Sequence, residues 1–152
     1  MKKRFLLSTL SLLLIVCSCS EKVQVDGATG GSYIEAVVNG TTFKSTTTNI
    51  SFATTTSPTQ ITITGNGPNA GEYIVLVIKN YDKANPVGTY TIGTSTTSAA
   101  YAAYHRPNSN ADEIATSGVI EIKGVAVLGT YGNFNFATQN SNITSGTLSL
   151  LY

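Results

Sequence analysis

The chain has 152 residues, with nine Lys or Arg, eight Asp or Glu and one His, so its formal net charge is +1. Residues 1–18, which we predict to be cleaved off, include three of the basic side chains. The remainder, 19–152, therefore has six basic and eight acidic side chains and a net charge of −2. This balance provides no basic surface, which makes nucleic acid and anionic lipid headgroups poor partners. A chain of this length is sufficient for one domain with a hydrophobic core.

The N-terminus has the pattern of a secretory signal peptide. Lys2, Lys3 and Arg4 precede an apolar run of about a dozen residues, Phe5–Val16. A helix that spans a bilayer needs about 20 apolar residues, so this run is too short for a stable membrane span. A basic start, a short apolar run and then small residues are typical of a signal peptide. We therefore predict a signal peptide, with its helix, over residues 1–18.

The chain has two cysteines, Cys17 and Cys19, separated by one residue. A disulfide between them would close a small, strained ring. A structural zinc site needs four ligands, and the chain has one histidine and no third cysteine. The segment Val16–Cys19 resembles the bacterial lipobox, which has an aliphatic residue, two small residues and an acceptor cysteine. This resemblance implies cleavage before Cys19 and acylation of Cys19. The competing frame, with Cys17 as acceptor, places branched Val16 where a small residue is expected.

A lipid anchor at Cys19 would hold the protein on a membrane without a transmembrane helix. Each buried methylene contributes about 0.8 kcal/mol, so one chain binds marginally and several bind firmly. Glu21 follows the cysteine closely, and an acidic residue there is associated with export to the outer face of the outer membrane in lipoproteins of the Bacteroidota type. We expect an outer-membrane envelope lipoprotein, with the choice between periplasmic and surface leaflets left open. Residues 19–32 are predicted to be the lipidated N-terminus and a flexible tether.

The rest of the chain, residues 33–152, has the pattern of β-strands joined by turns. Thr, Val, Ile and Tyr are frequent and favour strands. Asn39-Gly40 is the strongest short hairpin signal, and the continuous apolar run at 73–79 predicts a central strand buried on both faces. Alanine-rich 99–106 fits helix or strand, and its flanking turns favour strand. The predicted strands are 33–38, 42–44, 48–54, 60–64, 73–79, 88–92, 99–106, 114–123, 125–128, 132–138 and 143–152.

These segments predict an all-β domain, an antiparallel meander of roughly 8–10 strands that forms a β-sandwich or a flattened barrel. The sequence does not choose between the two. The stretches VVNGTTFKS, ITITGNG, VGTYTIG, SGVIEI, GNFNFAT and ITSGTLSL occur in this order. Together they resemble a group of small lipoproteins of the Bacteroidota type that is classed as a domain of unknown function. The resemblance covers residues 33–152 and implies the fold, but it provides no activity or residue role to transfer.

The titratable residues give no catalytic pattern. His105 would need an orienting carboxylate and a nucleophile to act as a general base, and no serine lies in a G-x-S-x-G motif. Asp112 and Glu113 are adjacent, so on a strand they would point to opposite faces, unlike the facing carboxylates of glycosidases. The oxygens around Asp82 match no calcium loop. We predict no catalytic residue, metal or cofactor, and keep a hydrolase as a remote alternative.

The aromatic residues give the better indication of a binding role. Tyr101 and Tyr104 have opposite parity on a predicted strand, so at most one of them faces the core. Exposed tyrosines can stack on sugars or anchor a protein interface. We name Tyr81, Tyr101, Tyr104 and His105 as candidate ligand contacts. The expected function is a non-catalytic binding module for a glycan, a small apolar ligand or an envelope protein. The alternative is a structural lipoprotein that pairs through an edge strand. The oligomeric state is left open.

Overall fold

The computed structural model describes residues 31–53, 59–94, 98–126 and 129–151. The predicted signal peptide, its helix and Cys19 lie outside these residues. The described residues form strands, turns and bends, without helices, which confirms the all-β prediction. Among them there is accordingly no helix with the length and apolarity that a membrane crossing requires.

The described residues form eleven strands, as many as the predicted ranges, but with different boundaries. They are β1 (Tyr33–Val38), β2 (Thr41–Lys44), β3 (Thr47–Ala53), β4 (Thr59–Asn66), β5 (Tyr73–Tyr81), β6 (Gly88–Ile92), β7 (Ala100–His105), β8 (Glu113–Ile114), β9 (Ser117–Ala126), β10 (Gly129–Ala137) and β11 (Asn142–Leu151). The predicted strand over 114–123 is two strands because the chain changes partner between them. The Ala115 amide donates to the Ala102 carbonyl of β7, whereas the Thr116 amide donates to the Ala137 carbonyl of β10.

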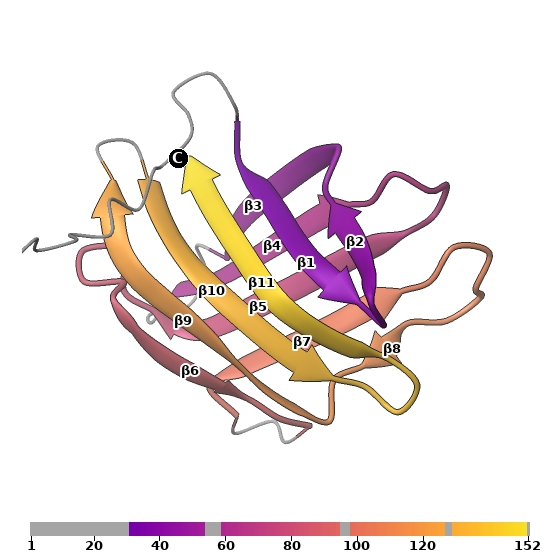
Figure 1. The fold of residues 1–152 in the computed structure, drawn as a ribbon. Helices are drawn as coiled ribbons and strands as arrows, with labels where there is room; N and C mark the ends of the chain where they lie inside the picture. Colours follow the sequence, from indigo (N-terminus) through magenta and orange to yellow (C-terminus); the bar gives the residue numbers. More distant parts are fainter. Residues whose placement is uncertain (1–30, 54–58, 95–97, 127–128, 152) are drawn as a thin grey trace, which may run out of the picture.

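All the described strands belong to one strongly curled sheet, in the order β2-β1-β11-β10-β9-β6-β7-β5-β4-β3, with β8 beside β7. In Figure 1, β1, β11, β10 and β9 form a front layer, and β3, β4, β5 and β7 cross behind it. The two layers meet at β6, which pairs antiparallel with β9 but touches β7 in a single parallel pair, Ile92 with Ala100. The predicted sequential meander is therefore wrong at β6. After β5, the chain forms β6 beside β9 and then returns to form β7 beside β5.

The two ends of the sheet order come together at one corner. β2 and β3 are consecutive in the chain and are joined by Ser45 and Thr46. The Ile34 amide donates to Ser45 Oγ and the Ser45 amide to the Ile34 carbonyl, while the Thr46 amide donates to the Asn66 carbonyl. This link holds β1 close to β4, so the architecture is a half-barrel with a corner closed by the chain itself.

The β1–β2 hairpin follows directly from its sequence. Asn39 and Gly40 have φ angles of 48° and 84°. Positive φ at both central residues is the signature of a type I′ turn, whose twist matches that of the flanking strands. The hairpin prediction at Asn39-Gly40 is confirmed, and the turn places the end of β1 and the start of β2 at one end of the sheet.

The core lies between the two layers. β5 is central as predicted, since it pairs with β4 on one side and β7 on the other. Ile74, Leu76 and Ile78 are fully buried, but Val75 and Val77 on the other face are only half-buried. The predicted burial on both faces is therefore wrong, because the described residues place no layer over the outer face of β5. Neighbouring side chains on the same face cover the two valines in part.

Candidate functional site

A cavity of about 380 Å³ opens at one end of the curled sheet. Three turns of the chain surround it, namely the β1–β2 hairpin, the β4–β5 turn and the segment after β7, which lie together at the right-hand end of Figure 1. The volume is within the range of small-molecule sites. The lining residues are Val38, Asn39, Thr41, Thr42, Phe43, Asn69, Glu72, Tyr104, Arg106 and Pro107.

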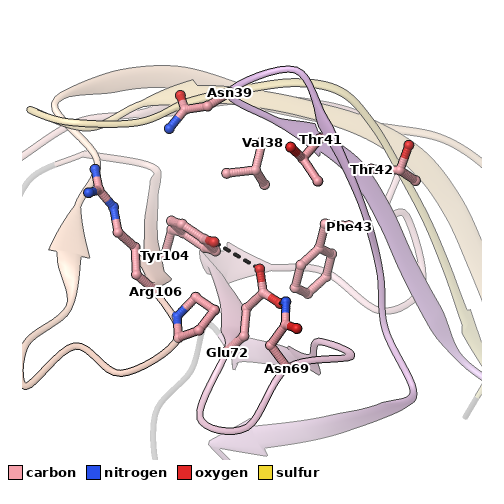
Figure 2. A pocket seen from close by; sticks show the side chains of 10 residues that line it. Val38, Asn39, Thr41, Thr42, Phe43, Asn69, Glu72, Tyr104 and Arg106 are labelled. Atoms are coloured by element: carbon pink, nitrogen blue, oxygen red, sulfur yellow. Dashed lines mark hydrogen bonds between the residues drawn. The ribbon is translucent and has the colours of Figure 1, made fainter.

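Glu72 supplies a nearly buried carboxylate to this cavity. It immediately precedes β5, and the residue is only 8 % exposed. Oε1 accepts a hydrogen bond from the Tyr104 hydroxyl at 2.8 Å, and Oε2 accepts one from the Asn69 amide at 2.7 Å. Figure 2 shows the Tyr104 hydroxyl directed at Glu72, with the ring of Phe43 nearby. Two neutral donors therefore hold the carboxylate in a fixed orientation.

The turn that carries Glu72 depends on glycine for close packing. A Cβ on Gly67 would lie 2.7 Å from Cε2 of Phe43 and 2.8 Å from Oε2 of Glu72. The Gly67 amide also donates to the Glu72 carbonyl at 2.7 Å. Since no side chain fits at position 67, the buried Phe43 ring and the carboxylate both pack against the bare backbone of this glycine.

Tyr104 is the donor on the β7 side of the cavity. Burial raises the pKa of Tyr104 well above its ordinary value. The hydrogen bond to Glu72 and the electrostatic interaction with Glu72 raise this pKa further. The phenol consequently keeps its proton throughout the physiological pH range and acts as a donor to Glu72. Its ring fills space next to the core, while its hydroxyl reaches the cavity.

Arg106 lies on another side of the cavity and is already paired. Its Nε forms an ion pair with Oε1 of Glu113. One terminal nitrogen donates to the Asn140 carbonyl at 2.8 Å and to Ser141 Oγ at 3.2 Å. Thr138 Oγ1 donates to the other oxygen of Glu113 at 2.6 Å. The guanidinium charge is thus neutralised within a network that ties the segment after β7 to the β10–β11 turn.

A second polar cluster lies outside the cavity, at the end of β7. Nδ1 of His105 is 2.8 Å from Oδ1 of Asp112, and the Tyr73 hydroxyl donates to the same oxygen at 2.6 Å. The rings of Tyr73 and His105 are stacked, with centroids 4.6 Å apart. Nε2 of His105 lies 3.1 Å from the Ser109 carbonyl. Because Nε2 is turned to this protein carbonyl, it is not placed to remove a proton from a substrate.

The Asp112 carboxylate gives this cluster a pH dependence. The Tyr73 hydrogen bond and the hydrogen bond and charge of His105 lower the pKa of Asp112 below its ordinary value. A carboxyl whose folded pKa is depressed adds stability above its unfolded pKa, about 3.9, and loses it as the pH falls through the folded pKa. Asp112→Asn should therefore reduce the free energy of unfolding at pH 5, and this deficit should shrink towards pH 2.

Urea denaturation of both proteins between pH 5 and pH 2 measures this effect. We expect a deficit of less than about 1 kcal/mol at pH 5, because the Asp112 side chain is 40 % exposed and solvent screens its interactions. Tyr73→Phe removes the largest contribution and should change the pH profile in the same direction. A deficit that stays constant from pH 5 to pH 2 would contradict this interpretation.

The structure separates the four residues that the sequence singled out as ligand contacts. Tyr104 lines the cavity. His105 belongs to the cluster outside it, and Tyr101 is half-buried on the outer face of β7. Tyr81 is only 1 % exposed and packs in the core beside Phe52, so its ring does not reach a surface ligand. As predicted from their parity, Tyr101 and Tyr104 do not both face the core.

Sequence reasoning missed most of the cavity. Glu72, Asn69 and Arg106 did not stand out, because acidic, amide and basic residues in turns are usually solvated. One signal was available for Glu72, since a lone acid directly before a continuous apolar strand is carried into the protein by that strand. Among the described residues no three His, Cys, Asp or Glu side chains are grouped as a metal site would require.

Residues 31–149 match the model of a protein family described as a domain of unknown function (DUF6252). The match includes more than three quarters of the chain and every strand that lines the cavity. The chain belongs to this family. The resemblance to a domain of unknown function is thereby confirmed at the level of the family. No curated protein and no solved structure matches this DUF6252 chain.

Proposed function

We propose that this DUF6252 protein is a lipid-anchored cell-envelope protein that binds a small ligand without catalysis. The observation that supports the proposal is the open cavity of about 380 Å³. Its lining includes the nearly buried carboxylate of Glu72, which two hydrogen-bond donors hold in a fixed orientation. A concave site with apolar walls and a few oriented polar groups is the usual form of a small-molecule site. Glu72 and Arg106 in the lining favour a polar ligand over the small apolar ligand expected from the sequence.

The position of the cavity fits a membrane-anchored receptor. The Leu151 amide at the end of β11 donates to Ser32 Oγ, so the chain enters the sheet beside the C-terminal end of β11. β1 then runs six residues to Val38, which lines the cavity. At about 3.3 Å per residue this strand separates the point of entry from the cavity by about 20 Å. A lipid anchor at Cys19 would therefore hold the opposite end of the sheet towards the membrane and leave the cavity accessible.

The absence of catalysis remains part of the proposal, and the geometry of His105 supports it. A general base needs a nitrogen that faces a substrate. Asp112 meets His105 as an orienting carboxylate would, but Nε2 is turned to the Ser109 carbonyl. This arrangement serves to hold the segment after β7 and does not present the imidazole to a nucleophile.

Strand addition is the second candidate function, and the edge of the sheet favours it. β3 is a seven-residue edge strand that pairs with β4 on one side and ends the sheet order. Its exposed positions carry Thr, Asn, Ser and Ala without a charged residue. Charged side chains commonly protect edge strands from pairing with other chains, so an uncharged edge can accept another strand.

A thermal-shift screen of the full chain in detergent tests the cavity proposal. The panel contains saccharides, amino sugars, amines, carboxylates and dipeptides. A ligand at one hundred times its Kd should stabilise the folded protein by about 2.7 kcal/mol, which raises the Tm measurably. Thr41→Trp, which places an indole on the face of β2 shared with Phe43, should abolish the shift by filling the cavity.

Thr147→Trp is the matched control. Thr147 is half-buried on β11 and does not line the cavity, so its replacement should leave the ligand-induced rise in Tm unchanged. No shift with any compound, or a shift that survives Thr41→Trp, would overturn the proposal that this cavity is the binding site.

A further inference from the structure

The Glu72 carboxylate is buried without a cation. Among the described residues the ion pairs are Lys44 with Glu35, His105 with Asp112, Arg106 with Glu113 and Lys123 with Glu121. None of them includes Glu72, whose side-chain partners are the neutral groups of Asn69 and Tyr104. Burying a charge is costly unless an opposite charge accompanies it. A cation that entered the cavity would offset this cost.

Arg106, the basic residue of the cavity lining, is already paired with an acid. Arg106 is held by Glu113, Asn140 and Ser141, as described above. Moving it to Glu72 would break that network and leave Glu113, which is itself mostly buried, without its partner. Glu72 therefore has no cationic partner among the described residues, while Arg106 is paired with Glu113.

The surroundings of Glu72 fit an organic ammonium group. The three N–H donors of a primary ammonium need oxygen acceptors, and Thr41 and Asn69 add side-chain oxygens to the lining that contains the carboxylate. The edge of the Phe43 ring and Oε2 of Glu72 pack against the same glycine, Gly67. Pro107, which is half-buried, and the nearly buried side chains of Val38 and Phe43 form the apolar part of the lining. Figure 2 shows the side chains of the lining arranged around one space.

From this geometry we infer that the cavity selects small organic primary amines, whose ammonium group pairs with Glu72 and whose carbon chain packs between Val38, Phe43 and Pro107. The inference rests on the proposed function, since it names the ligand class of the same cavity. Hydrogen bonds to an ionised acceptor are about twice as strong as neutral ones. The charge of the ligand, and not its size alone, consequently determines the affinity.

The test compares n-butylammonium chloride with n-butanol, a neutral molecule of the same length. Each is titrated into the ¹⁵N-labelled full chain in detergent micelles at low salt, with backbone amide shifts as the readout. We expect n-butylammonium to shift the amides of Thr41, Asn69 and Glu72 and to bind at least tenfold more tightly than n-butanol. Glu72→Gln should reduce this preference to less than about twofold, while Asp112→Asn, an acid outside the cavity, should retain it.

The outcomes separate the ligand class from the binding function. If n-butanol binds as tightly as n-butylammonium and shifts the same amides, the cavity binds ligands but the preference for amines is wrong. If neither compound shifts these amides and the thermal-shift screen also yields no ligand, the proposed function fails as well. The comparison of the two compounds on the wild-type chain remains decisive if Glu72→Gln does not fold.

Discussion

Replacing Leu76 with alanine should lower the free energy of unfolding by about 2–5 kcal/mol, the range for removing a large buried aliphatic side chain. Leu76 is fully buried and lies at the middle of β5. It pairs with Ile63 on β4 and with Ala102 on β7, both of which are also fully buried. Since these strands are held by hydrogen bonds on both sides, the walls of the new cavity can collapse only in part.

Val75→Ala is the matched control for this measurement. Val75 is the adjacent residue of β5 and points to the half-buried outer face. Its replacement should cost about 1 kcal/mol or less, the span of strand preferences measured in a host sheet. Urea denaturation of the wild type and both variants gives the comparison. If Leu76→Ala costs no more than an ordinary surface substitution, about 0.5 kcal/mol, this strand is not the centre of the core.

The local features of the fold could be predicted because they depend on neighbouring residues. Asn and Gly both tolerate the positive φ that a two-residue hairpin turn requires. Asn39 and Gly40 alone therefore predict the turn, and both have positive φ in the structure. A glycine inside a strand often marks a bulge, and the register between β9 and β10 shifts beside Gly124. Phe134 and Phe136 alternate with Asn133 and Asn135, and both phenylalanines are buried. Period-two patterning contains this information directly.

The arrangement of the strands could not be predicted in the same way. β6 pairs along its length with β9, which is distant in the sequence. It does not pair with β5, and it meets β7 in a single residue pair. Strands of similar composition can pair in either order, because each pairing buries a similar apolar face and satisfies the same backbone groups. The cavity depends on this order, since it assembles Phe43, Glu72 and Tyr104 from three separate parts of the chain. His105 and Asp112 were each noted, but their contact depends on the path of the chain between β7 and β8.

Cys19→Ala should move the protein from the membrane fraction to the soluble fraction, because it removes the predicted site of acylation. Several acyl chains hold a protein firmly, whereas the apolar run Phe5–Val16 is too short to replace them as a stable span. The variant is expected to lose incorporation of labelled palmitate as well. Fractionation of cells that express the full chain, followed by immunoblotting and palmitate labelling, measures both effects.

Cys17→Ala provides the control, since it changes the other cysteine of the same short segment. If cleavage occurs before Cys19, residue 17 leaves with the signal peptide, and its replacement should alter neither membrane retention nor labelling. Release of the Cys17 variant, with retention of the Cys19 variant, would assign the anchor to Cys17. Equal retention and labelling of the wild type and both variants would show that Cys19 alone is not the anchor, which would overturn its assignment as the acylated residue.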